Sequence, residues 1–243
     1  NENQDRPFGR AKLDNLRKLF FEGKLWEGNQ TAGDNLNGMQ TSFGTHLPIG
    51  DLKIRFTYPE GDITDYRRSL NLNEAISSVS FNAGGVNYKR EYFATNPDNV
   101  LVLRLSADKP KSVTMDMALD LMRQSEFTVE DNQMIFTGKV DFPLHGPGGV
   151  NFEGRIAVLT DNGEVKMDKA GISVSNADAV TMIVDVRTDY KNPDYKALCA
   201  TTVEEAGMKP YEALKLTHIK DYSDLFNRVE LNLGKDSNDT IPT

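Results

Sequence analysis

The sequence is poor in the residues on which many catalytic and metal sites depend. Its 243 residues include one cysteine, one tryptophan and three histidines. The single cysteine, Cys199, excludes an internal disulfide. The histidines, His46, His145 and His218, are far apart and form no HxH or HExxH pattern, so no metal site is predicted. No G-x-S-x-G stretch and no phosphate-binding glycine loop occurs, and no cofactor is indicated.

Two further absences limit the partners that we expect. The net charge is −8 and the sequence pI is about 5.0, which disfavours nucleic acid and anionic membranes because phosphate binding requires clustered Lys and Arg. No run of about 18 apolar residues occurs, so no membrane span is predicted. No signal peptide is recognisable and the first residue is Asn1, so we expect a processed chain or a piece of a longer protein.

What the sequence does contain is a recurring alternation of apolar and polar residues. In the first half of the chain, this period of two predicts strands with one buried face. Residues 83–85 (Ala-Gly-Gly) are typical of a tight hairpin turn, and residues 96–99 (Asn-Pro-Asp-Asn) of a second reversal. Residues 100–105 are apolar on both faces, so we expect them to form a central strand of an antiparallel meander.

Similar short segments continue along the chain, separated by turn residues such as Asp161-Asn162-Gly163. Few segments alternate strand with helix, so a parallel α/β fold is disfavoured. Ten or more short strands predict a mainly β fold, a large antiparallel β-sandwich. Beyond the meander, strands are expected at residues 51–58, 66–73, 112–121, 134–136, 152–158, 165–167, 172–174, 180–186 and 228–233.

Helical spacing appears at the N-terminal end of the chain. Apolar residues recur on one face between Leu13 and Phe20 and predict an amphipathic helix that ends near Gly23. A second short helix or a loop is expected to start at Leu25. Residues 27–50 are rich in Gly, Asn and Thr, so we expect a long irregular segment there.

Helical spacing returns near the C-terminus. One helix is expected from Pro193 to Gly207 and another from Pro210 to Leu225. The chain therefore divides into four predicted segments: 1–50, a helix plus an irregular loop packed on the sandwich; 51–188, the antiparallel β-sandwich; 189–233, a C-terminal helical segment and closing strand; and 234–243, the start of a linker.

Four short motifs, together with the meander, resemble one known family. They are residues 19–24 (LFFEGK), 47–52 (LPIGDL), 66–72 (YRRSLNL) and 218–229 (HIKDYSDLFNRV). In this order they resemble the N-terminal domain of the glycoside hydrolase family 95 enzymes, the inverting α-L-fucosidases and their α-L-galactosidase relatives. The resemblance spans nearly the whole chain.

The resemblance implies a β-sandwich of the supersandwich type, followed by a helical linker and an (α/α)₆ barrel that carries the catalytic carboxylates. It implies that this chain is inactive alone, that its partner is its own downstream barrel, and that the longer protein acts on a glycan. It also implies that the family's opening strands precede Asn1. The protein is expected to be bacterial and periplasmic, secreted or on the cell surface.

No catalytic residue is assigned from the sequence. An inverting glycosidase needs two carboxyls about 6.5–9.5 Å apart, but none of the 36 acidic residues lies in a distinguishing motif. The candidate ligand or cleft-rim residues are Phe43 and His46, which either contact a sugar or belong to a structural loop. Trp26 is expected in core or interdomain packing, His218 as a packing histidine, and Cys199 as a small buried hydrophobe.

Three functions remain open on this basis. The first is a non-catalytic domain that supports the catalytic barrel of a family-95-like α-L-fucosidase. The second is an autonomous carbohydrate-binding module, which would need an exposed aromatic platform or a Ca²⁺-like cluster of oxygens. The third is an interaction or surface β-domain unrelated to sugars.

Overall fold

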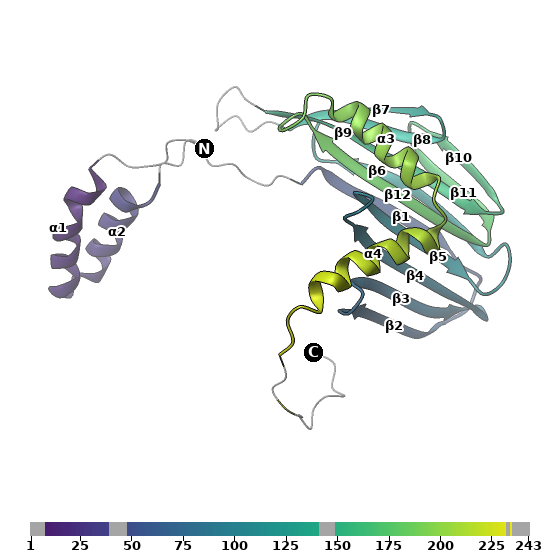
Figure 1. Cartoon of the computed structure of the whole chain (residues 1–243), viewed down its shortest axis with the longest axis horizontal. Helices are drawn as coiled ribbons and strands as arrows, with labels where there is room; N and C mark the ends of the chain where they lie inside the picture. Colours follow the sequence, from purple (N-terminus) through teal and green to yellow (C-terminus); the bar gives the residue numbers. More distant parts are fainter. Residues whose placement is uncertain (1–7, 39–47, 141–148, 232–233, 235–243) are drawn as a thin grey trace. The chain divides into compact units, whose positions relative to one another are not determined.

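The computed structural model describes residues 8–38, 48–140, 149–231 and 234 (Figure 1). They fall into two compact units, Asn1–Pro48 with Val140–Gly149, and Ile49–Lys139 with Val150–Thr243. Among these residues, no helix has the length and apolar character needed to cross a membrane. Phe43, His46 and His145 lie outside the described residues, and the four-segment division predicted from the sequence stays a prediction.

The first unit contains a hairpin of two helices, α1 (Gly9–Phe21) and α2 (Leu25–Leu36). The expectation of an irregular segment from residue 27 is therefore wrong for residues 27–36. Gly28 is buried and lets the helices approach, since a Cβ built on it would lie 2.9 Å from Cε1 of Phe20. Glycines lower helix propensity, which hid α2 from the sequence pattern.

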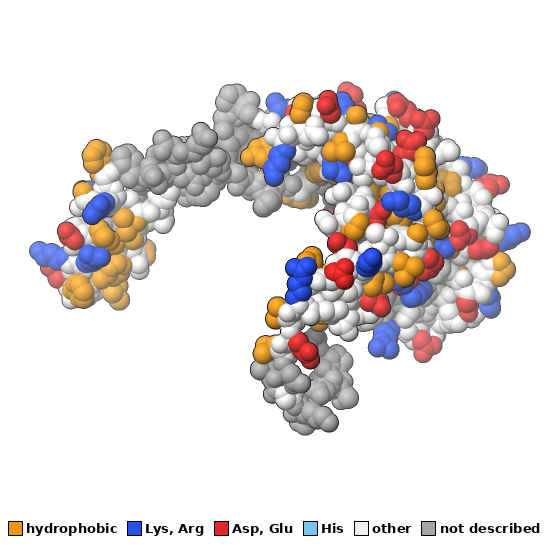
Figure 2. All heavy atoms as spheres, viewed as in Figure 1, with side chains coloured by type: hydrophobic (Ala, Val, Ile, Leu, Met, Phe, Trp, Pro, Cys, Tyr) orange, Lys and Arg blue, Asp and Glu red, His pale blue; other side chains and the backbone are white. Residues whose placement is uncertain are grey.

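The hairpin has little core of its own. Trp26 is 75% exposed and Phe21 is 91% exposed, so Trp26 does not pack in the core of the hairpin. Figure 2 shows hydrophobic side chains gathered on this unit. Two short helices with so little buried area gain few of the tertiary contacts that normally stabilise helices.

The second unit is mainly β, with two antiparallel sheets forming an open sandwich, as the sequence predicted. The smaller sheet has, in order, β1 (Gly50–Thr57), β6 (Val113–Leu121), β11 (Gly171–Ala177) and β10 (Glu164–Asp168). The larger sheet has, in order, β2 (Ile63–Asn71), β3 (Ile76–Ala83), β4 (Val86–Thr95), β5 (Val100–Ala107), β12 (Ala179–Thr188), β9 (Val150–Asp161), β8 (Gln133–Val140) and β7 (Ser125–Glu130).

The predicted meander is confirmed as β3, β4 and β5. Ala83 pairs with Val86 across the first hairpin, where Gly84 and Gly85 have positive φ angles of 55° and 76°. Val100 pairs with Thr95 across the second. β5 lies between β4 and β12 in the interior of the larger sheet, which agrees with its apolar character on both faces.

The C-terminal helices α3 (Tyr195–Gly207) and α4 (Tyr211–Phe226) pack on the larger sheet (Figure 1). α3 contacts β9 and β12, and α4 contacts β4. Their buried residues Val203 and Leu214 join Val102 and Ile183 of the sheet in one hydrophobic cluster. One face of the larger sheet is therefore covered by helices over its central strands.

The two sheets differ in width, since eight strands face four. β2 is exposed along its whole length, including Ile63, Tyr66 and Leu70. The closing strand expected at 228–233 is not observed at residues 228–231, which are exposed and irregular, and residues 232–233 lie outside the described part.

Two glycines of the larger sheet lie under aromatic rings. A Cβ built on Gly154 of β9 would lie 2.1 Å from Cζ of Phe136 of β8. The reverse arrangement also occurs, since a Cβ on Gly138 of β8 would lie 2.7 Å from Cζ of Phe152 of β9. Both rings are buried, and they fill the space that glycine leaves.

Candidate functional site

An open hollow of about 750 Å³ lies on the outer face of the smaller sheet. We call it the polar hollow; Lys53, Arg55, Asp116, Lys166, Asp168 and Ser173 line it with other residues of the four strands. The alternate residues Met117 and Ile172 are buried, so they point toward the larger sheet and the hollow opens to solvent on the other side.

The strand register explains the shape of the polar hollow. One row across the sheet runs Arg55, Asp116, Ser173 and Lys166, which are paired in that order. In the next row the long side chain of Lys53 on β1 is paired with a small residue, Ala118 on β6. Long side chains on the edge strands thus surround a floor of small residues on the central strands.

Several groups of the polar hollow are held by hydrogen bonds. Lys53 forms an ion pair with Asp120, and the pKa of Lys53 is raised by that hydrogen bond and by the charge of the carboxylate. The Ser173 hydroxyl donates to Asp116 Oδ1 at 2.7 Å. By contrast, the side chains of Arg55 and Lys166 have no hydrogen-bond or ion-pair partner among the described residues.

Asp168 shapes one end of the same floor. Its Oδ1 accepts hydrogen bonds from the backbone N–H groups of Ala170 at 2.8 Å and Gly171 at 3.2 Å. Gly171 cannot carry a side chain in this position, because a Cβ built on it would lie 2.2 Å from the backbone oxygen of Met117. The floor at this point is therefore bare backbone, fixed by the turn.

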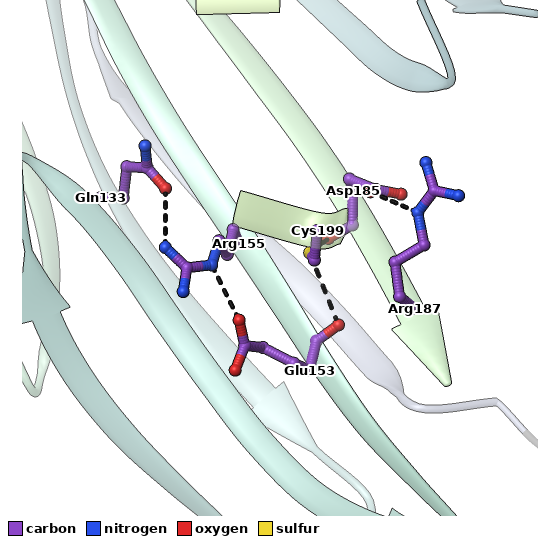
Figure 3. A network of polar contacts seen from close by, with 6 residues as sticks. All are labelled: Gln133, Glu153, Arg155, Asp185, Arg187 and Cys199. Atoms are coloured by element: carbon purple, nitrogen blue, oxygen red, sulfur yellow. Dashed lines mark hydrogen bonds and ion pairs between the residues drawn. The ribbon is translucent and has the colours of Figure 1, made fainter. Parts of the chain in front are cut away.

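A second polar cluster lies beneath α3, on neighbouring strands of the larger sheet (Figure 3). Arg155 Nε donates to Glu153 Oε1 at 2.8 Å on β9, and Arg187 Nε donates to Asp185 Oδ2 at 2.6 Å on β12. Asp185 pairs with Arg155 and Arg187 pairs with Glu153 in the strand register. Like charges are therefore never directly opposite each other.

Cys199 of α3 lies over this cluster and is fully buried. Its Sγ lies 3.7 Å from the backbone oxygen of Glu153 and 3.6 Å from that of Asp185, and its single proton can form a weak hydrogen bond to either. Burial, with the nearby carboxylates, raises the pKa of the thiol to about 12. The prediction of a small buried hydrophobe is confirmed, and a thiol with this pKa is a poor nucleophile near neutral pH.

A third cluster lies beneath α4, where Glu91 of β4 is buried. Its carboxylate accepts hydrogen bonds from Lys215 Nζ at 2.8 Å and from the Tyr211 hydroxyl at 3.0 Å, and it pairs with Lys89 Nζ at 3.1 Å. Burial raises the pKa of Glu91, but the hydrogen bonds and charges of Lys215 and Lys89 outweigh it and leave a lowered pKa. Burial and the Glu91 carboxylate raise the pKa of Tyr211.

The contacts of α4 extend along the helix to His218. This side chain is buried, stacks on Phe93 with the ring centroids 4.8 Å apart, and lies with Nε2 2.9 Å from the Glu74 backbone oxygen. Because a carbonyl oxygen only accepts, Nε2 is the donor. The prediction of a satisfied packing histidine is confirmed.

Each of the four buried carboxylates that the structure pairs with a cation lies in an ion pair inside the fold. Glu91, Glu153 and Asp185 are ion-paired as described, and Asp98 pairs with Lys209 Nζ at 2.6 Å. The pKa of Glu91 is lowered by the hydrogen bonds and charges of Lys215 and Lys89, so this carboxylate is unsuited to act as a general acid near neutral pH. In the described part of the chain, no group of three His, Cys, Asp or Glu residues has the geometry of a metal site.

Sequence reasoning did not find the polar hollow. Lys53, Arg55 and Lys166 occupy the exposed positions of predicted strands, where charged residues are ordinary. The one available signal was the small residue Ala118 among larger neighbours, and it has meaning only once the strand pairing is known. The positions of Phe43 and His46 stay predictions because both lie outside the described residues.

Comparison with known proteins gives a consistent result. Residues 1–193 match the model of the family described as "Glycosyl hydrolase family 65, N-terminal domain". "Alpha-L-fucosidase 2" of Arabidopsis thaliana is 28% identical over 94% of the chain, and "Probable alpha-fucosidase A" of Aspergillus niger is 27% identical over 91%. These names agree with the family resemblance of the motifs. The chain spans 31% and 29% of the length of these relatives.

A solved structure shares the fold. It is named "Putative kojibiose phosphorylase from human microbiome", and it matches 70% of this chain and 27% of its own with a TM-score of 0.50. The sequence identity is 11%, so this likeness concerns the fold alone.

Proposed function

The chain belongs to the glycosyl hydrolase family 65 N-terminal domain family, and from this premise we propose that it is the non-catalytic N-terminal domain of an α-L-fucosidase-type enzyme. In the longer protein it would support an (α/α)₆ barrel that hydrolyses a fucosylated glycan with inversion. The observation that carries the proposal is the match of residues 1–193 to an N-terminal-domain family, together with fucosidase relatives about three times as long.

The arrangement of the acidic residues supports a scaffolding role. Glu91, Asp98, Glu153 and Asp185 are all neutralised by Lys or Arg beneath the two C-terminal helices. Glu91 pairs with Lys215 of α4, and Asp98 pairs with Lys209 between α3 and α4, so these two charges join the helical segment to the sheet. Glu153 and Asp185 each pair with an arginine of their own strand. Bond-breaking carboxylates would instead need to face a substrate on both sides of the glycosidic bond.

The test compares two proteins on one substrate. The 243-residue chain and a longer version that includes the expected barrel are assayed with 2′-fucosyllactose, with release of fucose as the readout. We expect turnover by the longer protein only. Turnover by the 243-residue chain alone would overturn the non-catalytic assignment.

The stereochemical part of the proposal has its own readout. Proton NMR of the longer protein's reaction, recorded before the sugar mutarotates, distinguishes the two anomers of released fucose. Inversion of an α-linkage gives β-fucose first. Early formation of the α-anomer would contradict it.

The same proposal covers Phe43, His46 and the location of the protein. We propose that Phe43 and His46 contribute to the rim of the substrate cleft in the longer protein. His46→Ala and Phe43→Ala are then expected to raise KM for 2′-fucosyllactose, whereas unchanged kinetics would remove them from the rim.

We also propose a periplasmic, secreted or cell-surface location in a bacterium, which cell fractionation with an antibody to this chain tests.

A further inference from the structure

We propose that the polar hollow on the outer face of the smaller sheet binds a neutral oligosaccharide. The volume of about 750 Å³ suits a ligand of two or three sugar rings. It lies on the opposite side of the sandwich from the face that α3 and α4 cover. A ligand can therefore reach it without displacing either helix.

The polar hollow is built before a ligand arrives. The Lys53–Asp120 ion pair and the Ser173–Asp116 hydrogen bond connect neighbouring strands across the sheet. Asp168 fixes the turn at the other end through two backbone N–H groups. Groups held in place in this way lose little conformational freedom on binding.

The side chains around the floor offer both kinds of hydrogen bond that sugar hydroxyls require. Asp116 and Asp168 retain acceptor capacity, because a carboxylate has about four lone-pair sites. Arg55 and Lys166 are donors with no partner among the described residues, and they lie on opposite edges of the hollow. A sugar lying across the floor can then form hydrogen bonds with side chains on both edges of the hollow.

The charges around the polar hollow favour an uncharged ligand. Lys53, Arg55 and Lys166 are matched by Asp116, Asp168 and the Asp120 that pairs with Lys53. A strongly anionic or cationic ligand would meet like charges on one side. No aromatic ring is among the residues that line the hollow, so it lacks the aromatic platform expected of an autonomous carbohydrate-binding module. We therefore expect a weak accessory site in which hydrogen bonds carry the affinity, with a Kd of roughly 1–10 mM.

The choice of a fucosylated sugar as the probe rests on the proposed function, whereas the location of the site does not. The chain is titrated with 2′-fucosyllactose up to about 50 mM, well above the Kd expected for weak hydrogen-bonded binding, and ¹H–¹⁵N spectra are recorded. We expect saturable shifts of the backbone amides of Ala118, Gly171 and Ser173. Trigalacturonate is the anionic comparison and maltotriose the neutral, fucose-free comparison.

Two pairs of variants locate the site. Ala118→Phe fills the floor and is expected to weaken binding at least tenfold, while Thr57→Phe adds the same ring at an exposed position of the same sheet face outside the hollow and leaves binding within twofold. Lys166→Ala removes one free donor and is expected to weaken binding several-fold. Glu164→Ala, two residues earlier on β10, is its control. Circular dichroism and thermal unfolding establish that each variant is folded.

The outcomes separate this proposal from the proposed function. Binding of maltotriose as tightly as 2′-fucosyllactose keeps the site as a neutral-glycan site and removes only the fucose preference. Absent or non-saturating shifts, shifts confined to other parts of the chain, binding of trigalacturonate alone, or equal effects of Ala118→Phe and Thr57→Phe would each overturn the site. None of these results changes the expected difference in turnover between the chain and the longer protein.

Discussion

The charged side chains on the two outer faces of the sandwich differ in burial and in pairing. On the larger sheet, Glu153 and Asp185 lie beneath α3, with each carboxylate paired to an arginine. On the smaller sheet, Arg55 and Lys166 are exposed and unpaired among the described residues. Charges removed from water must be paired to be tolerated, whereas charges left in water remain available for a ligand. The covered face therefore serves stability and the open face is suited to recognition.

The largest effect is expected from breaking a pair on the covered face. Asp185→Ala leaves Arg187 beneath α3 without its carboxylate, but the Arg187 side chain is 23% exposed and keeps its hydrogen bond to Thr202. We therefore expect a loss of about 2–3 kcal/mol in the free energy of unfolding, within the range for a hydrogen bond to a charged group. Urea denaturation followed by circular dichroism measures it. The matched variant is Asp116→Ala on the open face, for which we expect little change, and equal losses in the two variants would remove the distinction between the faces.

Cys199 tests how completely the covered face is closed. Because burial raises its pKa to about 12 from the ordinary 9.0, the thiolate fraction at pH 8 is lower by roughly a thousandfold. We expect the folded chain to react with Ellman's reagent at least that much more slowly than the chain unfolded in urea. Rapid reaction of the folded chain would mean that α3 opens frequently from the sheet.

The pH dependence of stability sharpens the comparison at α4. The pKa of Glu91 is lowered in the folded chain, so its contribution is present above the unfolded value near 4.5 and is lost as pH falls through the lower folded value. We expect Glu91→Gln to lower the melting temperature most near neutral pH, and the difference from the parent chain to shrink below pH 4.5.

Two other carboxylates provide the background in that measurement. The pKa values of Asp108 and Asp178 are lowered chiefly by backbone N–H groups of Asn87 and Lys111, and both residues remain in Glu91→Gln. Their acid sensitivity is then common to both proteins and cancels in the difference. A difference that is constant from pH 7 to pH 3 would show that Glu91 contributes through packing and not through its charge.

The smallest effect is expected from removing an ion pair on the open face. Lys53→Ala breaks the pair with Asp120, but both side chains are exposed and solvent screens their attraction. We expect no measurable change in the urea midpoint, at low or at high salt. A clear loss of stability would mean that the open face also depends on its charges for folding.

The sequence predicted the fold where local pattern determines structure. Strict alternation with turn residues located the meander, and helical spacing located α3 and α4. It failed where the local signal was weak: α2 contains Gly28 and Gly33, and β7 has polar or charged residues at most positions. Residues 228–231 alternate like a strand, yet they have no partner strand among the described residues and are irregular.

The site was less accessible than the fold. β1 pairs with β6, whose sequence lies some 60 residues away, and β6 pairs with β11, a similar distance further on. Only these long-range registers bring Arg55, Asp116 and Lys166 into one row. The alternation of apolar and polar residues predicts which face of the sheet a residue occupies, but it contains no information on which strand lies beside it. The packing roles of Cys199 and His218 were predictable because each depends on its own helix.

On β8 and β9 a glycine of each strand packs against a phenylalanine ring of the other, so substitutions at these four positions depend on one another. Alanine at 154 would overlap the ring of Phe136, and alanine at 138 would overlap that of Phe152. Single replacements are therefore blocked. A larger residue at 154 can be accommodated together with a trimmed ring at 136, but a Cβ at 138 would also lie 2.9 Å from the backbone oxygen of Gln124, which a trimmed ring does not relieve. Sequence changes between β8 and β9 should therefore occur as linked double substitutions at positions 154 and 136, while Gly138 and Phe152 are retained.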